Sequence, residues 1–158
     1  HYQYIQNALQ VNMGHGYFAE MAQLAGISKT DWSYSTLFAD LDIDGDQDKD
    51  IIVGGRCTPG SFPKAPKSYC LKNEQGKFLD VTKDIFPELD GLGMITDIES
   101  GDLNGDGKPE IVFTGDWMPI TVYSYDGKAH HRNCVTRRFD NGEMVSCTSR
   151  GKLFIHKV

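Results

Sequence analysis

Short runs of β-branched and aromatic residues recur along the chain, and each is bounded by residues that favour turns. Ile51-Ile52-Val53 and Ile111-Val112-Phe113 are two such runs, and Val135–Phe139 is another. Runs of this length and composition, set between glycine, proline, asparagine and aspartate, are typical of strands. The pattern therefore predicts an all-β fold.

Two acidic segments precede two of these runs and divide the chain into repeats. Asp40–Asp50 leads into Ile51, and Asp102–Glu110 leads into Ile111. The matching acids and glycine of the two segments lie 62 residues apart, whereas the glycines that end the two runs lie 60 residues apart. The first copy therefore carries about two extra residues between loop and strand. A period near 60 indicates a repetitive architecture.

A glycine turn that ends on an aromatic residue is also repeated. Asn12–Phe18 recurs as Asn73–Phe78, and more weakly as Tyr125–Lys128. Each turn is expected to join two strands. One unit then contains a strand, an acidic loop, a strand, a longer connection, a strand, a glycine turn and a final strand. Four antiparallel strands per unit form the blade of a β-propeller.

The second acidic segment has the spacing of a calcium-binding loop. Oxygen-bearing side chains occupy positions 1, 3, 5 and 9, and Gly107 stands at position 6, where a sharp turn needs a residue without Cβ. Ca²⁺ takes roughly six to eight oxygen ligands. An EF-hand loop opens a helix, whereas this segment leads into a strand-forming run. The spacing predicts a calcium loop within a β-hairpin, with an acidic surface turn without metal as the alternative.

The first segment is compatible with two registers of the same loop. Asp40 at position 1 places Gly45 at the sharp turn and Asp48 at position 9, whereas a shifted register ends at Asp50 and places Gln47 at the turn. We favour the first register because glycine suits the turn. Two Ca²⁺ sites are therefore expected. Their predicted ligands, with Lys108 contributing its backbone carbonyl, are Asp40, Asp42, Asp44, Asp46, Asp48, Asp102, Asn104, Asp106, Lys108 and Glu110.

These loops, the Asn-x-x-Gly-x-Phe turns, Thr30–Ser33 and Gly115–Ile120 together resemble the FG-GAP/VCBS repeat family. The resemblance covers about residues 5–130 and is greatest to secreted proteins that also carry an ASPIC/UnbV segment. It implies integrin-α-like propeller blades in an extracellular, calcium-stabilised array for adhesion or ligand binding, with the metal opposite the usual ligand face. The first loop departs from the family pattern by its insertion, which leaves its ninth ligand open.

The repeats predict a single β-repeat domain over residues 1–158. Its parts are a half blade at 2–26, a blade with the first calcium loop at 35–82, a blade with the second calcium loop at 94–132, and a C-terminal β-hairpin and strand at 133–158. Residues 83–93 are expected to be a linker. A closed propeller needs about four to eight blades. About two and a half blades therefore indicate a partial propeller, or one completed between chains.

Several large apolar side chains are expected in the core or in a seam. The predicted core residues are Tyr17, Phe18, Met21, Leu24, Trp32 and Tyr34, and Trp117 and Met118 are expected to seal the seam between blades. The proline-rich connection Arg56–Cys70 is expected to be a spacer between strands. Alternatively, five of its residues contact an anionic or sugar ligand: Arg56, Phe62, Lys64, Lys67 and Tyr69.

Charge is unevenly distributed over the chain, whose net charge is −6. Residues 1–127 hold 20 acids and 9 Lys/Arg, whereas residues 128–158 hold 2 acids and 7 Lys/Arg. The basic end is expected to be a solvated face, or alternatively a patch for an acidic neighbour or an anionic polysaccharide. An acidic chain without a recognised module is not expected to bind nucleic acid. No apolar run is long enough to span a membrane.

The four cysteines form two pairs of equal spacing, Cys57/Cys70 and Cys134/Cys147. Disulfides between neighbours are favoured, because the second pair straddles an Asn-Gly hairpin turn. Zinc is the alternative, but neither pair has zinc-site spacing. Calcium loops and disulfides both suit a secreted, extracellular protein. The chain begins at His1 without a signal segment, so a processed product or an excised fragment is expected.

The sequence lacks the nucleophile-elbow, zinc-protease and phosphate-loop motifs of common enzymes. Nine of its acids lie in the two loops, where metal binding explains them better than acid–base catalysis. We therefore expect no enzymatic activity, and a module for adhesion or for binding a protein or carbohydrate ligand. The alternative function is a self-associating structural subunit of an extracellular filament, formed by pairing of blade edges between chains.

Overall fold

The computed structural model describes residues 6–30, 32–41, 48–103, 105–125, 130–138, 143–147 and 153–157. Two short helical segments, α1 (Thr82–Ile85) and the 3₁₀ helix η1 (Pro87–Leu89), lie between the sixth and seventh strands. The strands are β1 (Gln10–Gly14), β2 (Tyr17–Glu20), β3 (Trp32–Ala39), β4 (Asp50–Cys57), β5 (Tyr69–Glu74), β6 (Lys77–Asp80), β7 (Met94–Gly101), β8 (Glu110–Asp116), β9 (Ile120–Tyr125), β10 (His130–Arg138), β11 (Glu143–Cys147) and β12 (Leu153–Lys157).

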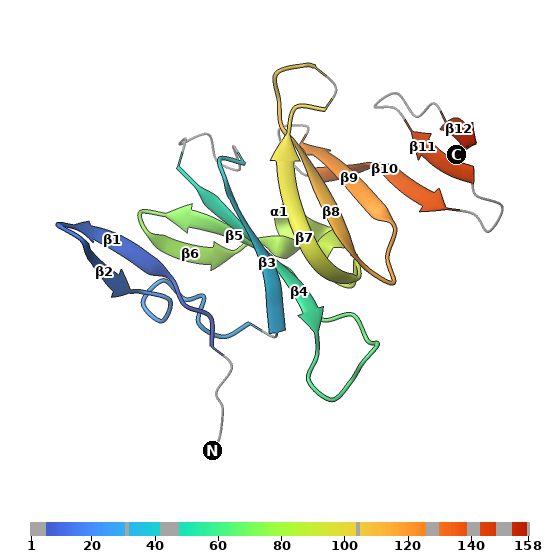
Figure 1. Ribbon diagram of the computed structural model, residues 1–158. Helices are drawn as coiled ribbons and strands as arrows, with labels where there is room; N and C mark the ends of the chain where they lie inside the picture. The colour runs from blue at the N-terminus through green and yellow to red at the C-terminus, as the bar shows by residue number, and fades with distance from the viewer. Residues whose placement is uncertain are drawn as a thin grey trace.

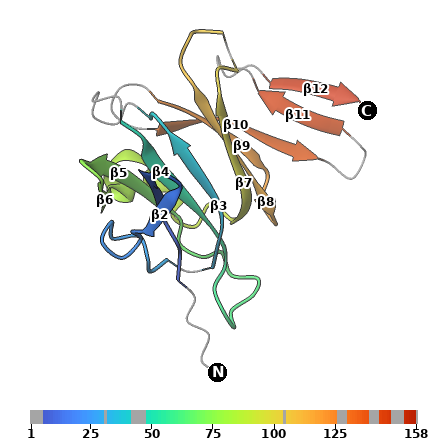
Figure 2. The same ribbon diagram turned by 60° about the vertical axis from the view of Figure 1, so that its left-hand side comes forward.

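The strands form three antiparallel sheets, which confirms the predicted all-β fold (Figure 1). β1 and β2 pair alone, β3 to β6 form a four-stranded sheet in chain order, and β7 to β12 form a six-stranded sheet in chain order. β11 and β12 thus continue the second sheet beyond β10 (Figure 2). Within the described residues the sheets stay open and form no closed barrel, as expected of a partial propeller.

Strand β4 is buried on both faces because a layer packs against each side of its sheet. Ile51 and Val53 point to one face and Ile52 to the other, as the period-2 geometry of a strand requires. Towards Ile51 and Val53 lie Ala22, Ala25 and other residues of the N-terminal segment. Towards Ile52 lies the second sheet. The run Ile51-Ile52-Val53 is continuous rather than alternating for this reason.

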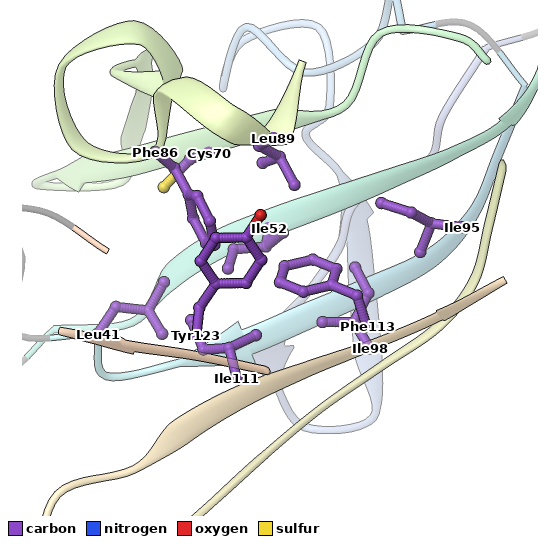
Figure 3. Packing of buried hydrophobic residues seen from close by; sticks show 10 residues of the cluster. All are labelled: Leu41, Ile52, Cys70, Phe86, Leu89, Ile95, Ile98, Ile111, Phe113 and Tyr123. Atoms are coloured by element: carbon purple, nitrogen blue, oxygen red, sulfur yellow. The ribbon is translucent and has the colours of Figure 1, made fainter. Parts of the chain in front are cut away.

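The larger core lies between the two main sheets, and α1 and η1 close one side of it (Figure 3). Its members, from both sheets and the helical segment, are Leu41, Ile52, Cys70, Phe86, Leu89, Ile95, Ile98, Ile111, Phe113 and Tyr123. The rings of Phe86, Phe113 and Tyr123 meet edge to face, with centroids 4.6–5.7 Å apart. Burial of each large side chain contributes roughly 1.5–3 kcal/mol to this contact between sheets.

Tyr123 is the polar exception in that core, and its hydroxyl is satisfied. It donates to Glu88 Oε2 at 3.1 Å and accepts from Arg132 Nε at 3.2 Å. Burial raises the pKa of Tyr123 to about 12, so the phenol keeps the proton that it donates. Residues 83–93 are therefore more than the predicted linker, because Phe86 and Leu89 are core residues and Glu88 anchors β9.

Two of the three predicted glycine turns lie in the described residues and share a pair of central residues with positive φ. His15-Gly16 and Gln75-Gly76 all have positive φ, as a type I′ hairpin turn requires. Asn12 pairs with Phe18 and Asn73 pairs with Phe78, and the first hairpin differs by a register shift between Asn12 and Gly14. Tyr125–Lys128 falls largely outside the described residues.

The structure corrects the predicted burial of the aromatic residues at the strand ends. The exposed side chains among them are Tyr17, Phe18, Leu24, Trp32, Tyr34 and Trp117, whereas Met118 does pack against the core between the sheets. Trp117 is 82% exposed and seals no seam. Tyr17 and Phe18 lie on the two-stranded sheet, and Trp32 and Tyr34 lie on the edge strand β3. Leu24 and Trp117 lie in turns.

Candidate metal centre

Both acidic segments lie at the same end of the two main sheets, because each connects a strand that runs towards that end to one that returns. Residues 40–49 join β3 to β4, and residues 102–109 join β7 to β8. β7 packs against both β3 and β4, which brings the two hairpins side by side (Figure 1). The sequence-predicted loops are therefore placed in hairpins, as expected.

The second loop is held by the carboxylate of its first residue. Asp102 Oδ1 accepts the backbone N–H of Gly105 at 2.7 Å, and its Oδ2 accepts that of Gly107 at 2.9 Å. Asp106 Oδ1 accepts the N–H of Lys108 at 2.8 Å. Gly107 has φ +85°, as the predicted sharp turn requires. These bonds gather the loop around Asp102 and leave the side chain of Lys108 in solvent.

The last acid of this loop is buried at the start of its strand. Glu110 is 3% exposed, and its Oε2 accepts the N–H of Leu103 at 2.8 Å across the loop. The first hairpin has the same feature in Asp50, which is 2% exposed and accepts the N–H of Asn73 at 3.0 Å. A buried carboxylate is costly unless hydrogen bonds or a cation compensate its charge.

Strand register makes Asp50 the counterpart of Glu110. Asp50 pairs with Ala39 across the first hairpin, and Glu110 pairs with Gly101 across the second. Both acids therefore open the returning strand, and the 60-residue offset that relates Gly55 to Gly115 also relates Asp50 to Glu110. The predicted ligand set omitted Asp50. The 60-residue offset between the two strands could have identified Asp50 from the sequence. The prediction instead aligned the two loops by the position of Gly45.

The remaining predicted ligands are only partly within the described residues. Asp40 is exposed at the end of β3, and Asp48 is half-buried with its Oδ1 atom inaccessible to solvent. Asp42, Asp44, Asp46 and Asn104 lie outside the described residues. In the part of the chain that the structure covers, no three His, Cys, Asp or Glu side chains converge closely enough to hold a metal ion.

The donors that are described fit a hard cation and no other common metal. They are carboxylates and backbone carbonyls, which suit Ca²⁺ and Mg²⁺, and neither loop offers thiolate or imidazole. Two buried carboxylates at equivalent strand starts, beside loops of further acids, are the arrangement that a bound Ca²⁺ would stabilise. The chemistry of the residues therefore fits the predicted metal.

The predicted disulfide between Cys57 and Cys70 is wrong, because both are free thiols. Cys70 pairs with Ile52 across β4 and β5, whereas Cys57 lies five residues further along β4. That offset separates the Cα atoms by roughly 16 Å along the strand, and a disulfide needs less than about 7 Å. Burial raises the pKa of Cys70 to about 12, which keeps its thiol protonated in the core. The side chains of Cys134 and Cys147 lie outside the described set.

The proline-rich connection after β4 lies at the other end of the sheets from the acidic loops (Figure 1). Lys67 stands 4.4 Å from the centroid of the Tyr69 ring and pairs with Asp80 at 3.2 Å. Arg56 is ion-paired with Asp116 of the second sheet. Arg56 and Lys67 are therefore both engaged in ion pairs within the protein.

Comparison with known families gives one match. Residues 42–113 match the FG-GAP-like repeat, a stretch that begins in the first acidic loop and ends in β8. A search of curated proteins finds no match. Among the described residues there is no helix of sufficient length and apolarity to cross a membrane.

Proposed function

Because this chain carries a repeat of the FG-GAP-like family over residues 42–113, we propose that its β-propeller-type blades form an extracellular, calcium-binding module without enzymatic activity. Its role is adhesion, or the binding of a protein or carbohydrate ligand. The two hairpin loops each hold one Ca²⁺, and the metal fixes the end of each blade.

The observation that carries this proposal is the pair of buried acids at equivalent strand starts. Asp50 and Glu110 are almost fully excluded from solvent, and the segment beside each supplies further carboxylates. Like charges at this density repel one another, and a divalent cation compensates both the repulsion and the cost of burial.

The chain's own residues prepare each loop for the ion. In the second loop the carboxylate of Asp102 orders the backbone by accepting the N–H groups of Gly105 and Gly107. Glu110 closes the loop through its bond to the N–H of Leu103. In the first loop Asp50 holds the equivalent place. Loops of this kind that are tuned to extracellular calcium have dissociation constants of about 10⁻⁴–10⁻³ M.

Isothermal titration of chelator-treated protein with Ca²⁺ tests the proposal. We expect two sites per chain, and a rise in melting temperature when Ca²⁺ replaces EDTA. Asp50→Asn and Glu110→Gln preserve shape and an acceptor oxygen for the N–H bonds, and each should remove or weaken one site. The matched control is Glu99→Gln on the exposed side of β7, which should change neither stoichiometry nor affinity.

Absence of binding heat in the parent, together with equal melting in Ca²⁺ and EDTA, would refute the metal role. Loss of both sites in a single isosteric variant would instead point to one shared centre. Equal effects of Glu99→Gln and Glu110→Gln would show that general surface charge is being measured, and would also contradict the proposal.

A second candidate function, self-assembly, is favoured by the two-stranded sheet. Among the described strands, β1 and β2 pair only with each other. Met13, Tyr17 and Phe18 expose most of their side chains there. Exposed strand edges with apolar side chains are templates for pairing with another chain. Light scattering over a hundredfold range of concentration tests this, with Phe18→Ser as the variant. A monomer at every concentration excludes assembly, and an assembly that Phe18→Ser leaves intact excludes this surface.

A further inference from the structure

A pocket of about 520 Å³ opens at the end of the sheets opposite the acidic loops. It lies between the start of β3, the end of β4 and the connection that follows, and Met94 at the start of β7 is among its lining residues. Its volume falls within the range of roughly 300–1,000 Å³ that small-molecule sites occupy. Neither the family match nor the acidic loops account for it.

The walls of the pocket are aromatic and open to solvent. Trp32, Tyr34 and Phe62 all line it, and each exposes about half or more of its side chain. They come from two separate segments of the chain, so their meeting here is a result of the fold. Flat rings left accessible around one concavity are suited to a ligand with an apolar face.

The charged side chain that lines the pocket, Arg56, is held in place and neutralised by other residues of the protein. Arg56 forms an ion pair with Asp116, and its guanidinium carbon lies 5.4 Å from the centroid of the Tyr34 ring. An anionic ligand would have to compete with Asp116 for this guanidinium. A neutral ligand with hydroxyl groups can instead accept from the remaining N–H donors of Arg56, which lines the pocket, without displacing Asp116.

We propose that this pocket binds one ring of a neutral pyranose sugar, an inference that rests on the ligand-binding function proposed above and names its ligand class. A pyranose has an apolar C–H face, which stacks on Trp32 and Tyr34. Its edge carries hydroxyl groups that can accept from Arg56 while the ion pair with Asp116 is kept. A purely apolar ligand would make no hydrogen bond to Arg56, and an anionic ligand would compete with Asp116 for its guanidinium group.

Binding at this pocket is separate in space from the acidic loops. The eight residues of β3 lie between the two, which corresponds to roughly 25 Å of strand. A sugar is therefore bound through side chains alone and needs no contact with a metal ion.

Tryptophan fluorescence tests the proposal, because the chain has only two tryptophans and one of them lines the pocket. Trp117→Phe removes the other, which is not among the lining residues, and leaves Trp32 as the single reporter. The probes are the methyl glycosides of glucose, galactose, mannose and N-acetylglucosamine, with methyl glucuronide as the charged comparison. All titrations are made in excess Ca²⁺. We expect a saturable change in Trp32 emission with at least one neutral glycoside and weaker binding of the glucuronide.

Variants in the same background locate the site. Tyr34→Ala should weaken binding about tenfold, the loss expected for one stacked ring. Tyr17→Ala is the matched control, because Tyr17 is as exposed as Tyr34 (74% and 73%) but lies on the two-stranded sheet. Arg56→Met should also weaken binding, with far-ultraviolet circular dichroism showing that the fold is retained. Equal losses in Tyr34→Ala and Tyr17→Ala would overturn the assignment, as would tighter binding of the glucuronide.

The failure of this inference can be told apart from failure of the calcium proposal. A chain that binds two Ca²⁺ but gives no emission change with any glycoside contradicts the sugar site alone. A chain that binds a glycoside but no Ca²⁺ contradicts the metal role alone and supports the pocket.

Discussion

The two repeats present the same strand to different surroundings, and the difference shows which way the layers are stacked. Ile51 and Val53 of the first repeat face the preceding N-terminal layer, and Ile111 and Phe113, 60 residues later, face the preceding four-stranded sheet. Ile52 faces the following sheet and is fully buried. Its counterpart Val112 is only half-buried, because no further layer covers that face in the described residues.

The repeats are therefore stacked head to tail. Each turns two residues of its run towards the layer before it, and the first also turns Ile52 towards the layer after it. The same face of the first repeat carries Gly54, where a Cβ would stand 2.6 Å from Ile95 Cγ2. The second repeat has Thr114 at that position, and its side chain is half-buried. Glycine is required where a following sheet packs closely, and a larger residue is accepted where none does.

The sharpest way to test this comparison is to truncate the equivalent residues Ile52 and Val112. Ile52→Ala should cost about 2–5 kcal/mol of unfolding free energy, because it leaves a cavity between the two sheets. Val112→Ala should cost about 1 kcal/mol or less, because its side chain faces no second layer. Chemical denaturation of both variants in excess Ca²⁺ measures the difference.

Equal losses in the two variants would contradict the stacking direction. A large loss in Val112→Ala alone would show that its face is covered, for instance by another copy of the chain. Measurement at two protein concentrations distinguishes that case, because a contact between copies makes the apparent stability depend on concentration.

The fold was largely predictable from the sequence, because the pattern of strand-forming runs and the length of the repeat determine most of it. The continuous apolar run at Ile51 and the Asn-to-Phe turns gave strands, hairpins and four-stranded blades, all of which depend on local chemistry. The helical segments α1 and η1 were missed, because elements of three or four residues are too short to show helical periodicity. Phe86 was therefore not recognised as a core residue.

The errors at individual side chains have a common physical cause. Aromatic residues favour strands whether or not a further layer covers them. The exposure of Tyr34 and Trp117 could therefore not be predicted from their residue type. Cysteine spacing does not determine cross-strand register, and register separates Cys57 from Cys70. Asp50 was omitted because the register of the first loop was judged from Gly45 rather than from the strand. The strand fixes register more firmly, because a slip would turn Ile51 and Ile52 to the wrong faces.

The smallest expected effect belongs to the ion pair that joins the repeats at equivalent positions, Arg56 and Asp116, which are 60 residues apart. Both side chains are partly exposed, so a double-mutant cycle with Arg56→Met and Asp116→Asn should give a coupling below about 1 kcal/mol. Raising NaCl from 0.1 to 1 M shortens the screening length from about 10 Å to about 3 Å and should reduce the coupling further.

The matched control is Lys67 with Asp80, an ion pair of similar exposure within the first repeat. Its lysine also lies over a tyrosine ring. If the two couplings are equal, charge pairing between repeats adds nothing specific, and packing around Ile52 holds the sheets together. A coupling of several kcal/mol for Arg56 and Asp116 that salt does not change would contradict this account. It would mean that electrostatics, rather than the apolar stripe, sets how one repeat meets the next.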